Sequence, residues 1–245
     1  MDFTLTEEQR MLKRFIREFA EKELAPIAAQ IDDDDRIPED IIQKLALVEI
    51  FGIPCSEEYS GAGKGYTEAT LASEEIARAS AAISMLASAN YPGIFAINKF
   101  GTDEQKAKYL PSLCLGKGIA SFSFTEAATG SDPKAITTTA KRDGAEYVLN
   151  GEKRFVTNST LDGIIIIFAR DGERISAFIA EKNKDGYSTT KPWRKMGTFG
   201  VPLTDVYLDD MRIPADNLLG GSGNGYALLL TKSLIIKWTH SLASN

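Results

Sequence analysis

The chain is poor in the residues that most catalytic triads and metal sites use. Among its 245 residues it has one histidine, His240, and two cysteines, Cys55 and Cys114, which lie in unrelated sequence contexts. A single histidine close to the last residue argues against a Ser-His-Asp hydrolase. Two isolated cysteines exclude a cysteine-rich metal site, and they fit a reducing compartment. We therefore expect a cytoplasmic protein without a metal centre.

Long apolar runs and an excess of basic residues are also missing. No apolar stretch reaches the roughly 20 residues of a membrane-spanning helix, and Met1-Asp-Phe-Thr4 lacks the basic start of a secretory signal. The net charge is −6 and the pI is near 5.0, whereas general nucleic-acid binding needs a basic surface. We expect no membrane span and no nucleic-acid partner. Hydrophobic residues make up 43% of the chain, which is enough for the core of one large or two ordinary domains.

The first half of the chain has helical periodicity. A capping box at Thr6-Glu-Glu-Gln9 opens a helix that Pro26 ends or follows. Further helices are predicted from Pro38 to near Gly52, over 66–79, over 82–100, and from a second capping box at Thr102-Asp-Glu-Gln105. The acidic run Asp32–Asp35 is interpreted as a solvated turn. A calcium loop is the alternative, but the run lacks the alternating ligands and the distal Glu of an EF-hand.

The second half changes to the alternation of strands after Gly116-Lys-Gly118. Tight turns are expected at Asp143-Gly144 and at Asn150-Gly151, because these dipeptides tolerate the positive φ of hairpin turns. The apolar run 163–169 is predicted to be a buried strand. The pattern indicates an α+β chain: an all-α domain over 1–117, an antiparallel β-barrel or sandwich over 118–222, and a C-terminal helix within 223–245.

The stretch 122–158 has the features of a cofactor site. A loop of small residues, 125–131, lies between two predicted strands. Gly130 permits close backbone approach, and consecutive N–H groups together with Ser131 could cradle a phosphate. Two hydroxyls and a flat apolar face are available from Thr125, Thr157 and Phe155. These residues predict a site for a large, planar, phosphate-bearing cofactor; taken alone, the strands and turns also fit an ordinary stack of β-hairpins with a polar turn.

Two motifs in this stretch resemble signatures of the acyl-CoA dehydrogenase family. Thr125-Glu-Ala-Ala-Thr-Gly-Ser-Asp132 is similar to TEPxAGSD, and Asn150-Gly-Glu-Lys-Arg-Phe-Val-Thr-Asn158 is similar to NGxKxxITN, at the spacing of the family. Ala127 replaces the usual proline, which leaves the loop less rigid. The resemblance implies that FAD is bound through Phe122, Phe124, Thr125, Gly130 and Ser131, with Phe155 beside the isoalloxazine and Thr157 near its reactive edge.

The resemblance also implies a reaction and its partners. The substrate would be an acyl-CoA thioester, from which a glutamate removes the α proton while the flavin accepts the β hydrogen as hydride, leaving a trans-2-enoyl-CoA. Expected partners are an electron-transfer flavoprotein and, where a third domain is present, further copies of the chain. Substrate contacts are implied for Ser131 and, near an acyl-chain tunnel, for Tyr91, Ile94 and Ile97; as a bare pattern the last three are more typical of plain core.

In the family a third, helical domain follows the β domain and carries the catalytic glutamate. Here residues 223–245 supply about one helix, and no Asp or Glu occurs after Asp216. We therefore expect the third domain to be largely missing, assign no catalytic residue, and expect impaired turnover. Two alternatives stay open. One is a non-enzymatic flavin- or CoA-binding scaffold that works with a partner chain, and the other is a relative of acyl-CoA oxidases or flavin monooxygenases that uses oxygen.

Overall fold

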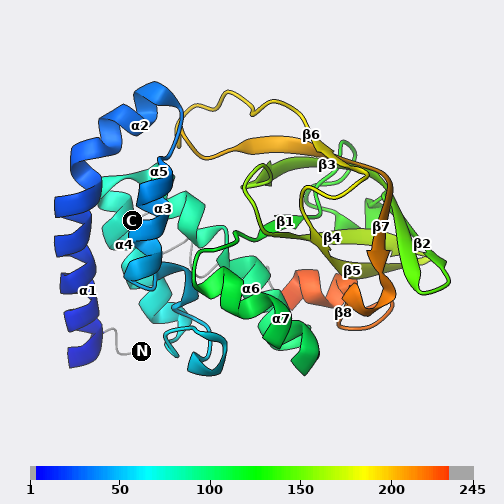
Figure 1. Cartoon of the computed structure of the whole chain (residues 1–245), viewed down its shortest axis with the longest axis horizontal. Helices are drawn as coiled ribbons and strands as arrows, with labels where there is room; N and C mark the ends of the chain where they lie inside the picture. Colours follow the sequence, from blue (N-terminus) through cyan, green and yellow to red (C-terminus); the bar gives the residue numbers. More distant parts are fainter. Residues whose placement is uncertain (1–3, 232–245) are drawn as a thin grey trace.

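The computed structural model describes residues 4–231, and in it a helical half lies beside a β half (Figure 1). The α-helices of the first half are α1 (Glu7–Phe19), α2 (Ala28–Asp34), α3 (Glu39–Leu47), α4 (Tyr66–Ala79), α5 (Ala81–Ser88), α6 (Tyr91–Phe100) and α7 (Asp103–Cys114). A final helix covers 225–231. The rest of the predicted C-terminal helix, 232–245, lies outside the described residues. Within 4–231 no helix is long and apolar enough to cross a membrane.

The capping box at the start of α1 is confirmed. The Thr6 hydroxyl accepts a hydrogen bond from the Gln9 amide at 3.2 Å, and the Gln9 side chain accepts one from the Thr6 amide at 3.0 Å. Pro26 follows α1, as the sequence predicted, but helical turns continue through it. A π-helical turn (Ala20–Leu24) and a 3₁₀ turn (Ala25–Ile27) carry the chain on into α2. Pro26 is tolerated because it lies in the first positions of a helical turn, where its missing N–H is not needed.

The single helix predicted over 82–100 is two helices, α5 and α6, with a break at Ala89-Asn90. Pro92 lies at the start of α6 and has no N–H to continue the hydrogen bonding of α5. Asn90 lies in this break, and its side chain makes two hydrogen bonds. Its side-chain amide donates to the Leu113 carbonyl at 3.2 Å and accepts from the Ala120 amide at 2.7 Å. Asn90 thus ties α7 to the first residues of the β half.

The acidic run Asp32–Asp35 ends α2 and is exposed, in keeping with a solvated segment. Asp35 has a left-handed backbone (φ 46°), and its carboxylate accepts a hydrogen bond from the Gly200 amide at 2.6 Å. Figure 1 shows the loop between β6 and β7 reaching across to α2 at this point. Nowhere within 4–231 do three or more His, Cys, Asp or Glu side chains gather in a group that could hold a metal ion.

The β half is one mixed sheet. Its strands are β1 (Ser121–Ser123), β2 (Thr139–Asp143), β3 (Glu146–Thr157), β4 (Ile164–Asp171), β5 (Arg174–Glu181), β6 (Tyr187–Thr189), β7 (Leu203–Pro214) and β8 (Leu218–Leu219). They pair in the order β6-β7-β3-β2-β4-β5-β8, with β1 beside β4. The α+β class is confirmed, but the sheet is not wholly antiparallel, because β1 and β2 both pair with β4 in parallel.

Only one of the two predicted turns is a turn. Asp143-Gly144 closes the β2–β3 hairpin, with Gly144 at a φ of 62°. At Asn150-Gly151 the prediction is wrong: β3 runs straight through, and its register against β7 shifts there as in a β-bulge. The Asn150 side chain accepts from the Asp210 amide and donates to the Asp210 carboxylate, both at 2.9 Å. Asn150-Gly151 therefore shifts the register of β3 against β7 instead of reversing the chain.

β4 is the strand that joins the two halves. Its residues Ile164, Ile166 and Phe168 pack with residues of α6 and α7, while Ile165, Ile167 and Ala169 pack with residues of β3 and β7. This explains the continuous apolar run, and the predicted buried strand is confirmed. Because one apolar core contains residues from both halves, the domain boundary near 117 stays a prediction. The same core buries Cys55 and Cys114, and both thiols are free.

Candidate functional site

The two motifs lie side by side in the structure. The Arg154 amide on β3 donates to the Thr125 carbonyl at 2.8 Å, which ties the small-residue loop to the second motif. Shortly before this loop, the Ser121 hydroxyl of β1 donates to the Thr157 carbonyl at 2.8 Å. Loop 125–131 and the end of β3 therefore lie next to each other.

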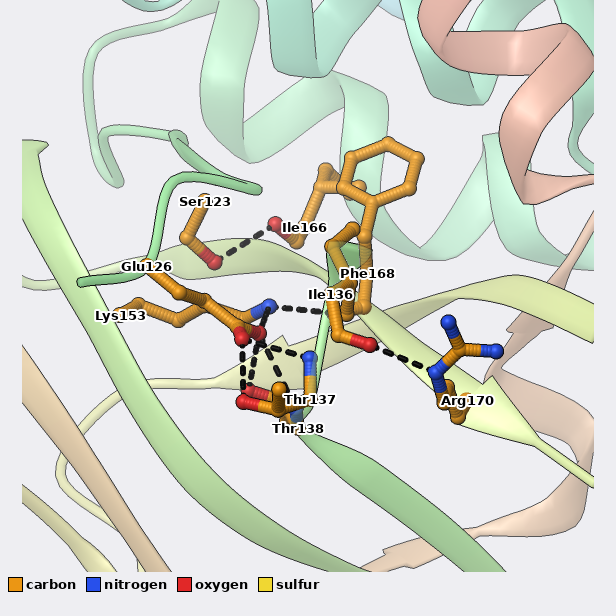
Figure 2. A network of polar contacts seen from close by, with 9 residues as sticks. All are labelled: Ser123, Glu126, Ile136, Thr137, Thr138, Lys153, Ile166, Phe168 and Arg170. Atoms are coloured by element: carbon orange, nitrogen blue, oxygen red, sulfur yellow. Dashed lines mark hydrogen bonds and ion pairs between the residues drawn. The ribbon is translucent and has the colours of Figure 1, made fainter. Parts of the chain in front are cut away.

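A buried ion pair fixes the base of the loop (Figure 2). Lys153, wholly buried on β3, donates from Nζ to Glu126 Oε1 at 2.7 Å and to the Phe168 carbonyl at 2.5 Å. Glu126 also accepts from both the amide and the hydroxyl of Thr137 and of Thr138, at 2.6 to 3.1 Å. The Glu126 carboxylate thus connects loop 125–131 to β3 and to the segment that leads into β2. The pairing is internal to the two motifs, since Glu126 belongs to the first and Lys153 to the second.

The same contacts determine the protonation state of Glu126. Burial opposes ionisation, but the positive charge of Lys153 and the hydrogen bonds from Lys153, Thr137 and Thr138 outweigh it and lower the pKa of Glu126 to about 2. Burial lowers the pKa of Lys153 to about 8, against the opposing effect of Glu126. A carboxyl group with so low a pKa stays ionised at neutral pH and is a poor proton acceptor.

Backbone hydrogen bonds within loop 125–131 hold its first part together, whereas the tip of the loop is exposed. Glu126 and Thr129 exchange amide-to-carbonyl hydrogen bonds at 2.9 and 3.1 Å. Gly130 and Ser131 follow and are both exposed, and a Cβ added to Gly130 would have no atom within 4 Å. Asp132 then accepts from the Lys134 amide at 3.0 Å. Gly130 is therefore not required by the packing of the described residues, and its role in binding a ligand stays a prediction.

Aromatic side chains lie on both sides of the loop, and they differ in exposure. Phe155 on β3 is 56% exposed and has a left-handed backbone with a φ of 56°. Phe122 and Phe124 are half-buried, and the Phe122 ring packs 4.9 Å from that of Phe168. Thr157, two residues after Phe155, is half-buried. Phe155 is the aromatic face that is open to a ligand, while Phe122 and Phe124 also belong to the packing of the core.

The three residues expected near an acyl-chain tunnel are inside the protein. Ile94 and Ile97 are wholly buried in the core between the two halves. The Tyr91 hydroxyl donates to the Ile50 carbonyl at 2.7 Å, and burial raises the pKa of this tyrosine. Their substrate role stays a prediction. The side chains of α5 and α6 that do reach the surface lie at neighbouring positions, such as Met85, Ser88 and Pro92.

Two further residues organise the site and were not singled out from the sequence. Asn158, fully buried with a φ of 60°, donates from its side chain to the Leu86 carbonyl of α5 at 3.0 Å. Lys182 donates from Nζ to the carbonyls of Ile119, Asn158 and Leu161 at 2.7 to 2.9 Å. Asn158 closes the second motif, so a signal for it was present. Lys182 had none, because its three partners come together only in the fold.

The comparison with known families agrees with this architecture. Residues 6–117 match the family described as "Acyl-CoA dehydrogenase, N-terminal domain", and residues 121–211 match "Acyl-CoA dehydrogenase, middle domain". The helical half, the β half and the loop between β1 and β2 are thus the first two parts of a known enzyme architecture. The chain belongs to the acyl-CoA dehydrogenase family, and the resemblance seen in the two motifs is confirmed.

Individual relatives give the same picture. An acyl-CoA dehydrogenase of Bacillus subtilis is 38% identical over 92% of this chain and 61% of its own length. Butyryl-CoA dehydrogenase from Megasphaera elsdenii has a TM-score of 0.93 at 30% identity, covering 99% of this chain and 66% of the other. An acyl-CoA dehydrogenase from Bacillus anthracis, solved as a complex with FAD, has a TM-score of 0.90 at 30% identity, over 98% of this chain and 42% of the other. The chain spans about three-fifths of the length of the curated relatives.

Proposed function

We propose that this chain is the flavin-facing part of an FAD-dependent oxidoreductase that acts on the CH–CH group of acyl-CoA thioesters. The observation that carries the proposal is the surface formed by loop 125–131 and the end of β3. There an exposed aromatic ring, Phe155, lies beside a loop whose tip is open and whose base is held by the Glu126–Lys153 ion pair. A site of this kind suits a planar cofactor with a phosphate chain.

The residues present fit FAD in two respects. A Cβ added at Gly130 would meet no described atom within 4 Å, so the loop backbone is open there to phosphate oxygens. The Thr129 hydroxyl is buried and has no hydrogen-bond partner among the described residues, which leaves a polar group available close to the loop tip. FAD, when bound, supplies the acceptor for the β hydrogen of the thioester. Thr125, Ser131 and Thr157 supply hydroxyls, and Phe155 supplies the apolar face.

Two of the described carboxylates next to this surface, Glu126 and Asp132, are unsuited to removing the α proton. Glu126 is held as an ion by Lys153 and by four hydrogen bonds from Thr137 and Thr138. Asp132 caps the Lys134 amide. We infer that a residue other than these acts as the base. The proposed reaction, α,β-dehydrogenation to a trans-2-enoyl-CoA, would then be impaired in the isolated 245-residue chain. A flavin- or CoA-binding scaffold that receives its base from a partner chain fits the same observation.

The electron pair removed from the thioester must leave the cofactor, and an electron-transfer flavoprotein is the acceptor that we propose. Consumption of oxygen during turnover would instead support the oxidase-like alternative. We propose that the chain assembles with further copies when a third domain is present. Both cysteines are free, which supports the prediction of a reducing, cytoplasmic location.

A glycine substitution in the loop tests the site directly. Gly130→Val places a branched side chain at the loop tip without a clash inside the protein, so the fold should be unchanged while the phosphates lose their approach. We expect the Kd for FAD, measured by isothermal titration, to rise by about tenfold, or about 1.4 kcal/mol. Ala145→Val, in the exposed β2–β3 turn, is the matched control. Equal affinity of the wild type and Gly130→Val for FAD would refute the placement of the phosphate cradle.

A further inference from the structure

Phe155 is half of an exposed aromatic pair. The Trp193 ring, in the segment between β6 and β7, lies with its centroid 6.0 Å from that of Phe155 and at an angle of 47° to it. Trp193 is 42% exposed and Phe155 is 56% exposed. Tilted rings at this separation are in attractive contact, so the two side chains form two adjoining walls. Trp193 lies outside both sequence motifs and meets Phe155 only through the fold.

One buried carboxylate holds both rings. Asp205, at the start of β7 and 2% exposed, accepts at Oδ1 from the Phe155 amide and from the Trp193 indole N–H, both at 3.2 Å. The left-handed backbone of Phe155 is uncommon for a bulky residue, so a partner for its amide matters. The Arg154 guanidinium lies 3.7 Å from the other carboxylate oxygen.

The segment that carries Trp193 is fixed to the same strand. The Asp205 amide donates to the Thr190 hydroxyl at 3.0 Å, and the Thr190 amide donates to the Asp205 carbonyl at 3.0 Å. The Trp193 amide donates to the Leu203 carbonyl at 2.8 Å. Backbone and indole of Trp193 are therefore both held, and the ring cannot turn away without losing its bond to Asp205.

Stability alone would favour the opposite arrangement, with the aromatic rings buried and the carboxylate exposed. A carboxylate is buried, which is costly unless it is fully partnered, while two large aromatic rings are left open to solvent. We propose that Asp205 is a positioning residue that holds Phe155 and Trp193 as two walls of the flavin site, and that Trp193 is a second aromatic contact for the cofactor. The inference rests on the proposed function, since it takes the ligand of this surface to be FAD.

The first test needs no cofactor. In a Trp238→Phe background Trp193 is the only tryptophan of the chain. Asp205→Ala should free the indole, shifting its emission to longer wavelength and raising its acrylamide quenching about twofold, whereas Asp205→Asn keeps an oxygen acceptor and should behave like the parent. Asp209→Asn, on the same strand and with no hydrogen bond or ion pair of its carboxylate among the described residues, is the control. Unchanged emission and quenching in Asp205→Ala would overturn the positioning role.

The second test adds FAD to the same proteins. Binding should quench Trp193 emission, and Asp205→Ala and Trp193→Ala should each weaken FAD binding by about fivefold to tenfold, while Asp205→Asn stays within about twofold of the parent. If the parent binds FAD and both alanine variants bind it equally well, the inference is wrong and the proposed function stands. If the parent does not bind FAD at all, the proposed function itself fails, and Asp205 is left with the role measured in the first test.

Discussion

Glu126 illustrates how a residue that a motif makes conspicuous can have a structural task. It lies in the first motif, within reach of the proposed cofactor surface, and from its type it could be taken for a base. Its contacts show otherwise, because Lys153, Thr137 and Thr138 use both of its oxygens. The resemblance implied that residues of both motifs contact one cofactor. The sequence could not predict this ion pair, since the pairing depends on how loop 125–131 lies against β3 in the fold.

Removing the charge of Glu126 should destabilise the protein strongly. Glu126→Gln leaves the Lys153 ammonium buried without its counter-charge, which typically costs about 3–5 kcal/mol. The free energy of unfolding from urea titration measures the effect. Glu173→Gln, in the exposed β4–β5 turn, is the control and should change stability by less than about 0.5 kcal/mol. A loss in Glu126→Gln no larger than that of the control would contradict the structural role of the pair.

At the scale of elements, one buried carboxylate on α4 binds basic side chains of α1. Glu75 on α4 accepts from Arg17 Nε at 2.8 Å and Nη2 at 2.9 Å, and from Arg78 at 3.0 Å. Lys13 lies 3.4 Å away. Hydrogen bonds from Arg17 are the largest cause that lowers the pKa of Glu75 to about 2, against the opposing effect of burial.

The contacts of Glu75 should make the free energy of unfolding depend on pH in the acid range. Because the folded pKa of Glu75 lies below its ordinary value of 4.5, its contribution is complete above pH 4.5 and is lost as the pH falls towards about 2. Glu75→Gln should lower the free energy of unfolding at pH 7 by about 1–3 kcal/mol. It should also flatten the acid slope between these two pH values. Glu74→Gln, whose carboxylate is 42% exposed and pairs only with Lys13 among the described residues, should leave the slope almost as in the wild type.

The elements that were predicted well are those with local signals. The capping boxes at Thr6 and Thr102, the bounds of α4 and the buried run of β4 all follow from nearby residues. The elements that were predicted wrongly depend on contacts between residues far apart in the sequence. Asn150-Gly151 is a bulge because β7 lies alongside, and a Cβ at Gly151 would lie 2.5 Å from the Thr138 hydroxyl. In the site, Phe155 was predicted from its motif, whereas Trp193 and Asp205 meet it only after folding.

At the scale of the whole molecule, the isolated chain should hold a cofactor surface without completing the reaction. Abstraction of an α proton needs a base within hydrogen-bond reach, and the loss of a general base typically slows a reaction by about a hundred- to ten-thousand-fold. Anaerobic mixing of the FAD-loaded chain with a series of acyl-CoA thioesters should therefore give no rapid bleaching of the flavin absorbance. Bleaching at a rate ordinary for this family would mean that a base exists among these 245 residues.

FAD should bind on the surface made by loop 125–131 and the end of β3. Hydrogen–deuterium exchange of the purified chain, measured by mass spectrometry with and without FAD, tests it most directly. We predict that FAD slows exchange in peptides covering 122–131, 153–158 and 190–197, and leaves the peptides of α1 and α4 unchanged. Saturating FAD that changes exchange nowhere, or that protects only the helical half, would contradict binding of FAD on this surface.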